Sequence, residues 1–339
     1  MAQPFIESSW TQEDQTFEQP LRPDKFEDFV GQENIQKRLK IMIQAAKERN
    51  ESLGHCLFSG PPGLGKTTLS HLIAKTMGSN ITATSGPVIE KPGDLAGLLT
   101  NLQDKDILFI DEIHRLPKTI EEYLYSAMED FVLDLIIDSG PNARSVQVKL
   151  NKFTLIGATT RFGLLSSPMR SRFLFHARLD YYDDASLQKI LLRSASLLRI
   201  PVTLDASEVV AKRSRGTPRI ANNLLRWVRD FAQISKILKI EKETACEALH
   251  LLNIDEEGLD EMDKRMLSLI IKHYDGGPVG IQTLGVALSE DTETLSEVYE
   301  PYLIMKGYLK RTLRGREATN LAYKHLGLQI PANKNGDST

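Results

Sequence analysis

Cysteine is scarce in this chain, and several other features that mark particular classes of protein are missing as well. The 339 residues contain two cysteines, Cys56 and Cys246, which lie far apart and make neither a metal-binding spacing nor an evident disulfide. Such usage is typical of a reducing cytosol. No apolar run approaches the roughly 18 residues of a membrane span, and segment 1–20 lacks the basic start and apolar stretch of a secretory signal. We therefore expect a cytoplasmic protein, not associated with membranes, with a flexible leader over 1–20.

The sequence also lacks an overall positive charge, since its formal net charge is -3. Charge is nevertheless uneven near the C-terminus. Segment 255–300 carries twelve acids and three bases, whereas 301–330 carries six bases and one acid. A basic patch on an otherwise repelling region is typical of a nucleic-acid footprint. On its own, the arginine-rich turn in "LKRTLRGREAT" (309–319) is more often a solvated hairpin, so the rest of the chain has to decide between these readings.

The segment "HCLFSGPPGLGKTTLSHLIAKTM" at 55–77 is the most informative stretch. A short apolar run predicts a buried strand, the pattern G-x-x-x-x-G-K-T follows, and apolar residues then continue at helical spacing. Glycines such as Gly63 and Gly65 let backbone N–H groups wrap phosphates, and the helix N-terminus adds its dipole. We expect Lys66 to reach the β- and γ-phosphates of ATP and the Thr67 hydroxyl to ligate Mg²⁺.

Two adjacent acids follow a second apolar run in "DILFIDEIHRLP" (106–117). Adjacent acids are usually solvated, but these come directly after a predicted buried strand and downstream of a phosphate loop. We expect Asp111 to hold the Mg²⁺ shell and Glu112 to polarise the attacking water.

A third strand, "FTLIGATTR" (153–161), ends in hydroxyl groups, and "SPMRSRF" (167–173) follows it with two arginines. Thr160 is a candidate for sensing the γ-phosphate, although a threonine at a strand end is more often a cap. Phosphoryl transfer needs a cation on the γ-phosphate, and Arg170 and Arg172 are candidates. An arginine there would face a neighbouring subunit better than its own loop, so a ring with each site completed in trans is expected.

The order of the predicted elements indicates three domains. Apolar runs alternating with helical stretches over 21–182 predict an α/β ATPase core with a doubly wound parallel sheet and ligand at the carboxyl ends of the strands. Helix-rich 183–254 predicts a small helical lid. In it, "SRGTPRIANN" places Arg219 in the first turn of a helix, from which it could touch the γ-phosphate, although a surface arginine is an equal alternative.

The C-terminal region, 255–339, reads as three helices followed by a hairpin, which is a winged helix-turn-helix. Thr292 is the expected cap of the third helix. Such domains usually bind DNA, although some dock proteins. Arg311 and Arg316 lie on the two arms of the hairpin, and Gly315 frees its turn. This placement suits contact with backbone phosphates of duplex DNA, with little sequence reading.

Together these motifs resemble the RuvB family, bacterial AAA+ motors that drive branch migration of Holliday junctions. The matching segments, which run in order from about 21 to 320, are "LRPDKFEDFVGQENI", "GPPGLGKTTL", "ILFIDEIHRL", "AMEDFVLDLII", "GPNARSV", "FTLIGATTRFGLL", "SRGTPRIANNLL" and "KRTLRGREAT". The resemblance implies that Thr160 is the first sensor, Arg172 the arginine finger, Arg219 the second sensor and Tyr182 an adenine-side contact. It also implies nucleotide contacts by Leu21, Arg22, Gly63, Lys66, Thr67, Thr68, Glu129, Asp130 and Phe131.

The resemblance further implies a homohexameric ring on duplex DNA that works with the junction-binding protein RuvA and the resolvase RuvC in recombination and repair. It assigns DNA contact to Arg311 and Arg316. The stretch 133–150 is similar to a hairpin that docks RuvA in the family, and its apolar Leu135, Ile136 and Ile137 suit that role. A plain hairpin with one buried face is the alternative.

Some positions depart from the family pattern. Leu313 stands in the wing where proline is common, Glu317 lies beside Arg316, Trp227 takes an expected basic position on the lid helix, and Leu174 takes the place of a glycine. Two other functions also fit parts of the sequence. A clamp-loader-type ATPase switch has a similar core but no basic winged helix, and an ATP-binding regulator has no need of an arginine finger.

Overall fold

The structure, a computed structural model, describes residues 19–136 and 145–331, which form two compact units. The first unit spans Leu21–Tyr182, and the second contains the described residues from Asp183 onward. Among the residues described, no helix is long and apolar enough to cross a membrane. The predicted leader, apart from Gln19 and Pro20, lies outside the described residues.

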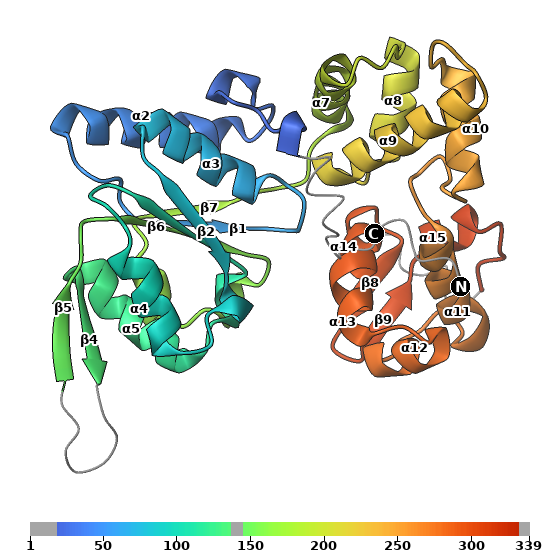
Figure 1. Cartoon of the computed structure of the whole chain (residues 1–339). Helices are drawn as coiled ribbons and strands as arrows, with labels where there is room; N and C mark the ends of the chain where they lie inside the picture. Colours follow the sequence, from blue (N-terminus) through green and yellow to red (C-terminus); the bar gives the residue numbers. More distant parts are fainter. Residues whose placement is uncertain (1–18, 137–144, 332–339) are drawn as a thin grey trace. The chain divides into compact units, whose positions relative to one another are not determined.

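The first unit is built on a five-stranded sheet with the order β2-β3-β6-β1-β7, in which all neighbouring strands are parallel. Figure 1 shows α2 and α3 on one face of this sheet and α4 and α5 on the other. This arrangement confirms the predicted doubly wound parallel sheet. The strands are β1 (Cys56–Ser59), β2 (Ile81–Ser85), β3 (Ile107–Asp111), β6 (Thr154–Thr159) and β7 (Phe175–Arg178), and the helices are α2 (Glu33–Arg49), α3 (Lys66–Met77), α4 (Pro92–Thr100), α5 (Lys118–Glu129) and α6 (Ser167–Ser171).

The central strands form because they are continuous apolar runs buried on both faces, as a parallel sheet requires. All six residues of β6 and the first four of β3 are buried. They pack with α4 and α5 in a cluster that includes Leu108, Ile120 and Leu155. Two further strands, β4 (Val132–Ile136) and β5 (Ser145–Lys149), pair antiparallel as a separate hairpin that stands out from this unit in Figure 1.

The second unit begins with four helices, as the lid prediction required. They are α7 (Asp184–Leu197), α8 (Leu204–Lys212), α9 (Pro218–Ile234) and α10 (Lys242–Leu251). The Asp183 side chain caps α7 by accepting from the Ser186 amide at 2.7 Å. Trp227, which departs from the family pattern, faces the helix bundle and donates its indole N–H to the Ala248 carbonyl at 2.7 Å. A structural contact therefore accounts for this departure.

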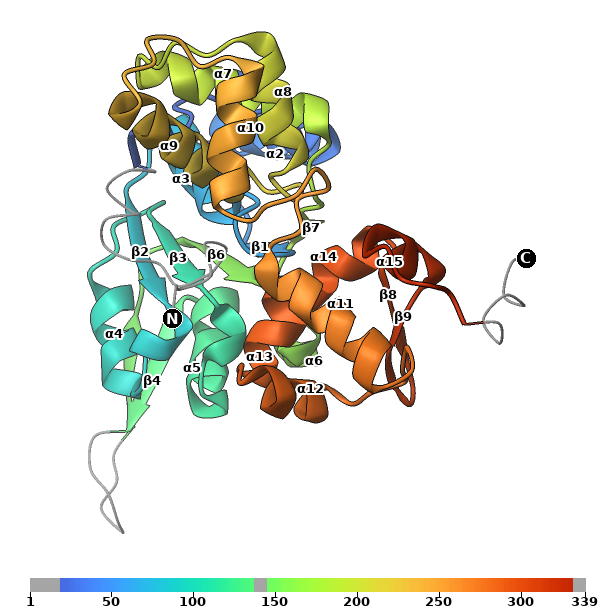
Figure 2. The same ribbon diagram turned by 90° about the vertical axis from the view of Figure 1, so that its right-hand side faces the viewer.

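The same unit ends in a winged-helix arrangement with its own core (Figure 2). Its elements are α11 (Glu261–His273), α12 (Ile281–Leu288), α13 (Thr292–Thr294), a π-helical segment (Leu295–Tyr299), α14 (Glu300–Met305), β8 (Leu309–Thr312), β9 (Gly315–Ala318) and α15 (Asn320–His325). The predicted cap Thr292 is wrong: Asp291 caps this helix, accepting from the amides of Glu293 and Thr294. Helix α15, after the hairpin, was not predicted.

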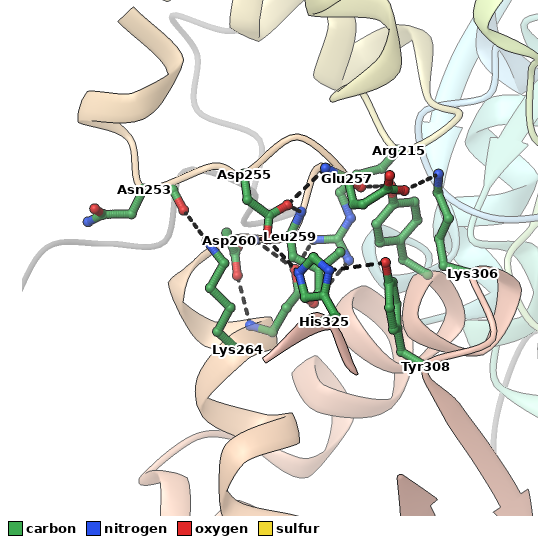
Figure 3. A network of polar contacts seen from close by, with 12 residues as sticks. Arg215, Asn253, Asp255, Glu257, Leu259, Asp260, Lys264, Lys306, Tyr308 and His325 are labelled. Atoms are coloured by element: carbon green, nitrogen blue, oxygen red, sulfur yellow. Dashed lines mark hydrogen bonds and ion pairs between the residues drawn. The ribbon is translucent and has the colours of Figure 1, made fainter. Parts of the chain in front are cut away.

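Buried polar contacts join the lid to the winged helix (Figure 3). Arg215, 3% exposed, donates to both carboxylate oxygens of Asp263 at 3.0 and 3.3 Å, and its guanidinium lies 4.2 Å from the centre of the Tyr302 ring. In the connecting segment, Asp255 accepts from the Leu259 amide and binds His325 Nε2 at 2.9 Å. Because Arg215 lies in the short loop between α8 and α9, this contact ties the segment before α9 to α11 and α14.

Candidate nucleotide site and candidate nucleic-acid interface

The glycine-rich loop between β1 and α3 has the backbone that a phosphate cradle needs. Gly60 and Gly65 have φ of +133° and +99°, and a Cβ on Gly60 would lie 2.4 Å from the Leu179 carbonyl oxygen. Only glycine fits such a position. Lys66 begins α3 and is 7% exposed, with its ammonium donating to the carbonyls of Gly60 and Pro61 at 2.8 and 2.7 Å. Lys66, which the sequence predicts to bind the phosphates of ATP, therefore lies over the phosphate loop.

The sheet topology brings the ends of three predicted strands together. β6 pairs with β1 on one side and with β3 on the other, and the Gly60 amide donates to the Thr159 carbonyl at 3.2 Å. The phosphate loop, Asp111 and the end of β6 therefore share the carboxyl edge of the sheet, where open α/β folds bind ligands. Thr160, the predicted sensor, directly follows the last residue of β6.

Polar contacts organise this edge in ways the sequence did not indicate. The buried Thr159 hydroxyl lies 2.9 Å from His114 Nδ1 and accepts from the Arg161 amide at 3.0 Å. Glu112 has a φ of +46°, and its carboxylate pairs with Arg115 at 2.9 Å. The left-handed conformation at Glu112 turns the chain sharply after β3, and such strained residues recur at functional sites. The sequence did offer a signal for Thr159, because it is a second hydroxyl residue at the end of this strand, directly before Thr160.

A buried tyrosine packs behind the phosphate loop. Tyr182, 8% exposed, donates its hydroxyl to the Leu64 carbonyl at 3.1 Å, and burial raises its pKa. A Cβ on Gly31 would lie 2.6 Å from the Tyr182 ring, and one on Gly65 would lie 3.2 Å from Phe29. The contact that the resemblance assigns to Tyr182 therefore lies next to the predicted phosphate loop.

Four more of the residues assigned to the nucleotide by resemblance, Leu21, Arg22, Thr67 and Thr68, also belong to this side of the unit. Leu21 is 5% exposed. Arg22 lies close enough to His71 on α3 to lower the pKa of that imidazole, after the larger effect of burial. The salt bridge from Asp24 to Lys75 on α3, at 2.7 Å, holds this segment against the helix. Thr67 and Thr68 occupy the first turn of α3, with partly exposed side chains.

These residues fit a magnesium nucleotide. Glycines that leave room for phosphates, a lysine at the helix start and a helix N-terminus are the donor set for phosphate. Mg²⁺ usually keeps several waters and takes one or two carboxylates besides phosphate oxygens, which matches Thr67 and Asp111. In the described part of the chain, no group of three or more His, Cys, Asp or Glu side chains is placed to hold a metal ion.

Four predicted residues lie at the opposite edge of the sheet. Phe131 packs its ring 5.8 Å from Phe153, just before β6, and 6.4 Å from His55, just before β1. Arg172 pairs with Glu129 at 2.9 Å, and its guanidinium lies 4.3 Å from the centre of the Tyr125 ring. Asp130, exposed, lies between Glu129 and Phe131 in the chain. Phe131 thus contacts the residues that precede β1 and β6, and Arg172 comes shortly before β7, so Arg172 lies at the amino edge of the sheet and Lys66 at the carboxyl edge.

Arg219, the predicted second sensor, lies in the first turn of α9 in the other unit. The turn before it is formed by two consecutive left-handed residues, Arg215 (φ +55°) and Gly216 (φ +69°). Pro218 then starts the helix, as expected for its fixed φ. The predicted helix start is confirmed, but the Thr217 hydroxyl donates to the Arg215 carbonyl and makes no cap.

The wing presents its two predicted DNA-binding arginines differently. Arg311 and Arg316 are direct partners in the β8–β9 register. The Arg311 side chain is 66% exposed, whereas that of Arg316 is 10% exposed and bonds to the buried carboxylate of Glu300. The two arginines therefore differ in exposure, with Arg311 facing solvent and Arg316 largely buried. Leu313, at the tip of the wing, is fully exposed.

The predicted docking hairpin is present as β4 and β5, with partners that include Leu133 with Val148. Ile137 lies outside the described residues, and the side chains of Leu135 and Ile136 are not described. Leu174, where the family pattern has glycine, is 76% exposed.

Comparison with known proteins identifies three consecutive matches along the chain. Residues 21–179 match the Holliday junction DNA helicase RuvB P-loop domain, 182–255 the RuvB AAA lid domain, and 256–327 the RuvB C-terminal winged helix domain. The chain is 62% identical over 322 residues to the Holliday junction branch migration complex subunit RuvB of Protochlamydia amoebophila, covering 95% of this chain and 97% of that protein. It is 58% identical over 324 residues to the subunit of that name in Flavobacterium psychrophilum, covering 96% and 95%. The Thermotoga maritima RuvB Holliday junction branch migration motor is a similar solved structure, with a TM-score of 0.84 at 50% identity, covering 92% of this chain and all of that one.

Proposed function

This chain belongs to the RuvB family, and from that premise we propose that it is an ATP-hydrolysing motor that moves Holliday junctions by translocating duplex DNA. The proposal includes a homohexameric ring, acting in the cytoplasm with RuvA and RuvC. It rests on the whole set of domains, because the three family matches together span residues 21–327 of the chain.

The placement of Arg172 carries the proposal of a ring. Lys66 lies at the carboxyl edge of the parallel sheet and Arg172 at the amino edge, so one chain does not bring both to one nucleotide. Head-to-tail packing of copies would set the phosphate loop of one subunit against Arg172 of the next. A head-to-tail interface repeats around an axis and gives a ring when its rotation closes.

In such a site each residue has a defined task. Lys66 and the loop amides hold the phosphates, and Thr67 and Asp111 hold Mg²⁺, which neutralises charge on the phosphates when bound. Glu112 orients the attacking water, and Thr160 contacts the γ-phosphate. Arg172 of the neighbouring subunit stabilises the charge that develops during transfer, and Arg219 of the lid contacts the γ-phosphate. The proposed nucleotide contacts are completed by Leu21, Arg22, Gly63, Gly65, Thr68 and Tyr182 of the same subunit and, beside Arg172, by Glu129, Asp130 and Phe131 of the neighbouring one.

We further propose that the winged helix holds the DNA backbone through Arg311 and Arg316, and that the β4–β5 hairpin docks RuvA. Support for the first is the exposed Arg311 on a basic hairpin in a domain that is otherwise acidic. Support for the second is a hairpin separate from the main sheet.

The decisive experiment measures ATP-dependent dissociation of a synthetic four-way DNA junction by the purified protein with its RuvA partner, with Lys66→Ala as control. We expect dissociation that requires ATP and both proteins, and none with the variant, because Lys66 holds the phosphates. DNA-stimulated ATP hydrolysis without junction movement would contradict the motor and favour a clamp-loader-type switch.

A further inference from the structure

A buried carboxylate lies behind the wing. Glu300, the first residue of α14, is 1% exposed, and it is removed from the hairpin by a stretch of chain that includes Tyr302 and Leu303 in the core. Burying an ionised carboxylate is costly unless it is paired and hydrogen-bonded. The partners of Glu300 therefore indicate why an acid occupies this position in the winged helix, which we also call the head domain.

Glu300 contacts both wing arginines, but unequally. Arg316 donates from Nε and Nη2 to Glu300 Oε2 at 3.1 and 2.8 Å. Arg311 places its Nε 3.8 Å from Glu300 Oε1, which is near enough for attraction but too long for a hydrogen bond. Two hydrogen bonds therefore hold the Arg316 guanidinium on Glu300, whereas Arg311 is only attracted to this carboxylate by its charge.

The backbone under Arg316 is fixed as well. The Arg316 amide donates to the Val279 carbonyl at 2.8 Å, and the Val279 amide donates to the Arg316 carbonyl at 3.0 Å. The loop before α12 therefore pairs with β9 on the side away from β8. The chains approach so closely that a Cβ on Gly315 would lie 2.4 Å from the Val279 carbonyl oxygen, and one on Gly277 would lie 2.3 Å from that of Arg316. Position and side chain of Arg316 are therefore both determined by the head domain.

Two arginines opposite each other in a hairpin repel, which destabilises the pairing. Arg311 and Arg316 are such a pair, because they are directly opposed in the β8–β9 register. A carboxylate between them removes the repulsion and fixes where the guanidinium groups lie. Glu300 is the acid that the structure places there.

We propose that Glu300 is a positioning residue for DNA binding: it anchors Arg316 and, through that anchored pair, orients the exposed Arg311 toward backbone phosphates. The inference rests on the proposed function, in which the wing holds DNA. Arg311 has no hydrogen bond to Glu300, so it can move onto a phosphate without breaking one. The Glu300–Arg316 bonds stay in place while it does so.

The competing explanation is that Glu300 merely lowers the positive charge of the wing. The two explanations predict opposite signs for Glu300→Gln, which removes one negative charge with little change in shape. If Glu300 acts only as a counter-ion, its negative charge weakens DNA binding, so Glu300→Gln should bind DNA more tightly. A positioning residue should weaken binding when it is lost, because a buried Arg316 without its carboxylate leaves its place.

Glu317→Gln is the matched control, since it removes the same charge from the same wing. Glu317 is partly exposed, opposite Lys310, and its contact is a long one of 3.4 Å from the Thr312 hydroxyl. We expect Glu317→Gln to bind duplex DNA as tightly as the parent or more tightly, and Glu300→Gln to bind about tenfold more weakly. Fluorescence anisotropy of a labelled duplex with the full chain, over a salt series, measures both.

The salt series separates positioning from charge. Each phosphate contact adds about 0.9 to the slope of log K against log salt concentration. We expect the slope to fall in Glu300→Gln, as it should in Arg311→Gln, because phosphate contacts are lost. Equal or tighter binding by Glu300→Gln, with a slope unchanged or steeper, would overturn the proposal.

A double substitution covers the case in which Glu300→Gln does not fold, judged by its thermal unfolding midpoint. Removing both members of a buried pair avoids an uncompensated charge. Since Glu300 acts through Arg316, adding Glu300→Gln to Arg316→Gln should change DNA affinity less than twofold. A further large loss in the double variant would show that Glu300 acts independently and would overturn the assignment. If neither the parent nor Glu317→Gln binds duplex DNA, the proposed function fails, whereas the assignment of Glu300 fails only against a parent that binds.

Discussion

Lys66 and Arg172 are the residues that most directly test how the candidate ATPase site is divided. The ammonium of Lys66 lies over the phosphate loop, and the guanidinium of Arg172 lies at the other edge of the sheet beside Glu129. If each site takes Arg172 from the neighbouring subunit, then Lys66→Ala and Arg172→Ala damage different halves of a shared site. Each variant alone should lose at least about 10³-fold in turnover, the usual effect of removing an arginine finger.

Mixing the two inactive variants should restore part of the activity. An interface that joins the phosphate loop of an Arg172→Ala subunit to the arginine of a Lys66→Ala subunit has both groups intact. We expect steady-state ATP hydrolysis to rise with mixing and to peak at intermediate ratios. Nucleotide binding by Arg172→Ala alone should remain, which serves as the folding control. A mixture no more active than its components would argue against a site completed in trans.

Sequence patterns predicted those residues whose chemistry requires a fixed spacing. Lys66, Thr67 and Asp111 were predicted because a strand, a glycine loop and a helix in this order leave few alternatives. Thr159 and His114 were missed because their contact joins positions 45 residues apart. The burial of Arg316 was missed for a related reason, since Glu300 precedes it by 16 residues and nothing local marks the pair.

Among the elements, His55 links three at the amino edge of the main sheet. Its Nδ1 accepts from the Leu155 amide of β6 at 2.8 Å, and its Nε2 donates to the Met128 carbonyl of α5 at 3.0 Å. These bonds require a neutral ring, and burial lowers the pKa of His55, partly opposed by the bond to Met128. Protonation would turn the acceptor Nδ1 into a donor facing the Leu155 amide.

The pH dependence of stability follows from this depressed pKa. An unfolded histidine titrates near about 6.5, so the unfolded chain binds more protons below that pH. Stability from neutral His55 is present above about pH 6.5 and is lost as the pH falls toward the folded-state pKa, by up to about 1.4 kcal/mol per pH unit. The urea midpoint of the parent should therefore drop more steeply between pH 7.5 and 5.5 than that of His55→Gln. Parallel slopes would contradict this account, because the carboxylates titrate alike in both proteins.

Element types were predictable where the pattern extends over many residues, and their ends were not. The central strands β1, β3 and β6 were found because they are buried on both faces and therefore largely apolar. The cap of the helix that starts at Thr292 was misassigned because "EDTET" offers several capping side chains, of which Asp291 makes the bonds. Helix α15 spans six residues, Asn320–His325, too few for periodicity to indicate.

For the molecule as a whole, the buried pair of Arg215 and Asp263 joins the lid to the winged helix. Removing one member of a buried ion pair leaves an uncompensated charge and costs about 3–5 kcal/mol, whereas removing both is often near neutral. Arg215→Met should therefore lower the stability of the unit that contains lid and head by about that amount. Arg215→Met combined with Asp263→Asn should recover most of the loss, because asparagine can still accept from the Asp260 amide.

Urea unfolding of the full chain with Trp10→Phe as background, followed by the fluorescence of Trp227 in the lid, measures this effect. A surface charge offers the control: Lys212→Met breaks a pair with Glu208, both side chains more than half exposed, and should leave the urea midpoint nearly unchanged. A double variant as unstable as Arg215→Met would mean that the buried aspartate is not what makes the single change costly.

The attachment of the wing has a mechanical consequence. If a DNA-binding hairpin moved freely relative to its domain, part of each conformational change would be lost in bending the hairpin. Here the grip is tied at its base, because Val279 and Arg316 bond to each other in both directions and two glycines allow the chains to touch. In a motor that pulls DNA by its wings, a rotation of the head domain would then be transmitted to the DNA with little loss. The length of each pull would be set by the head and lid rather than by the hairpin.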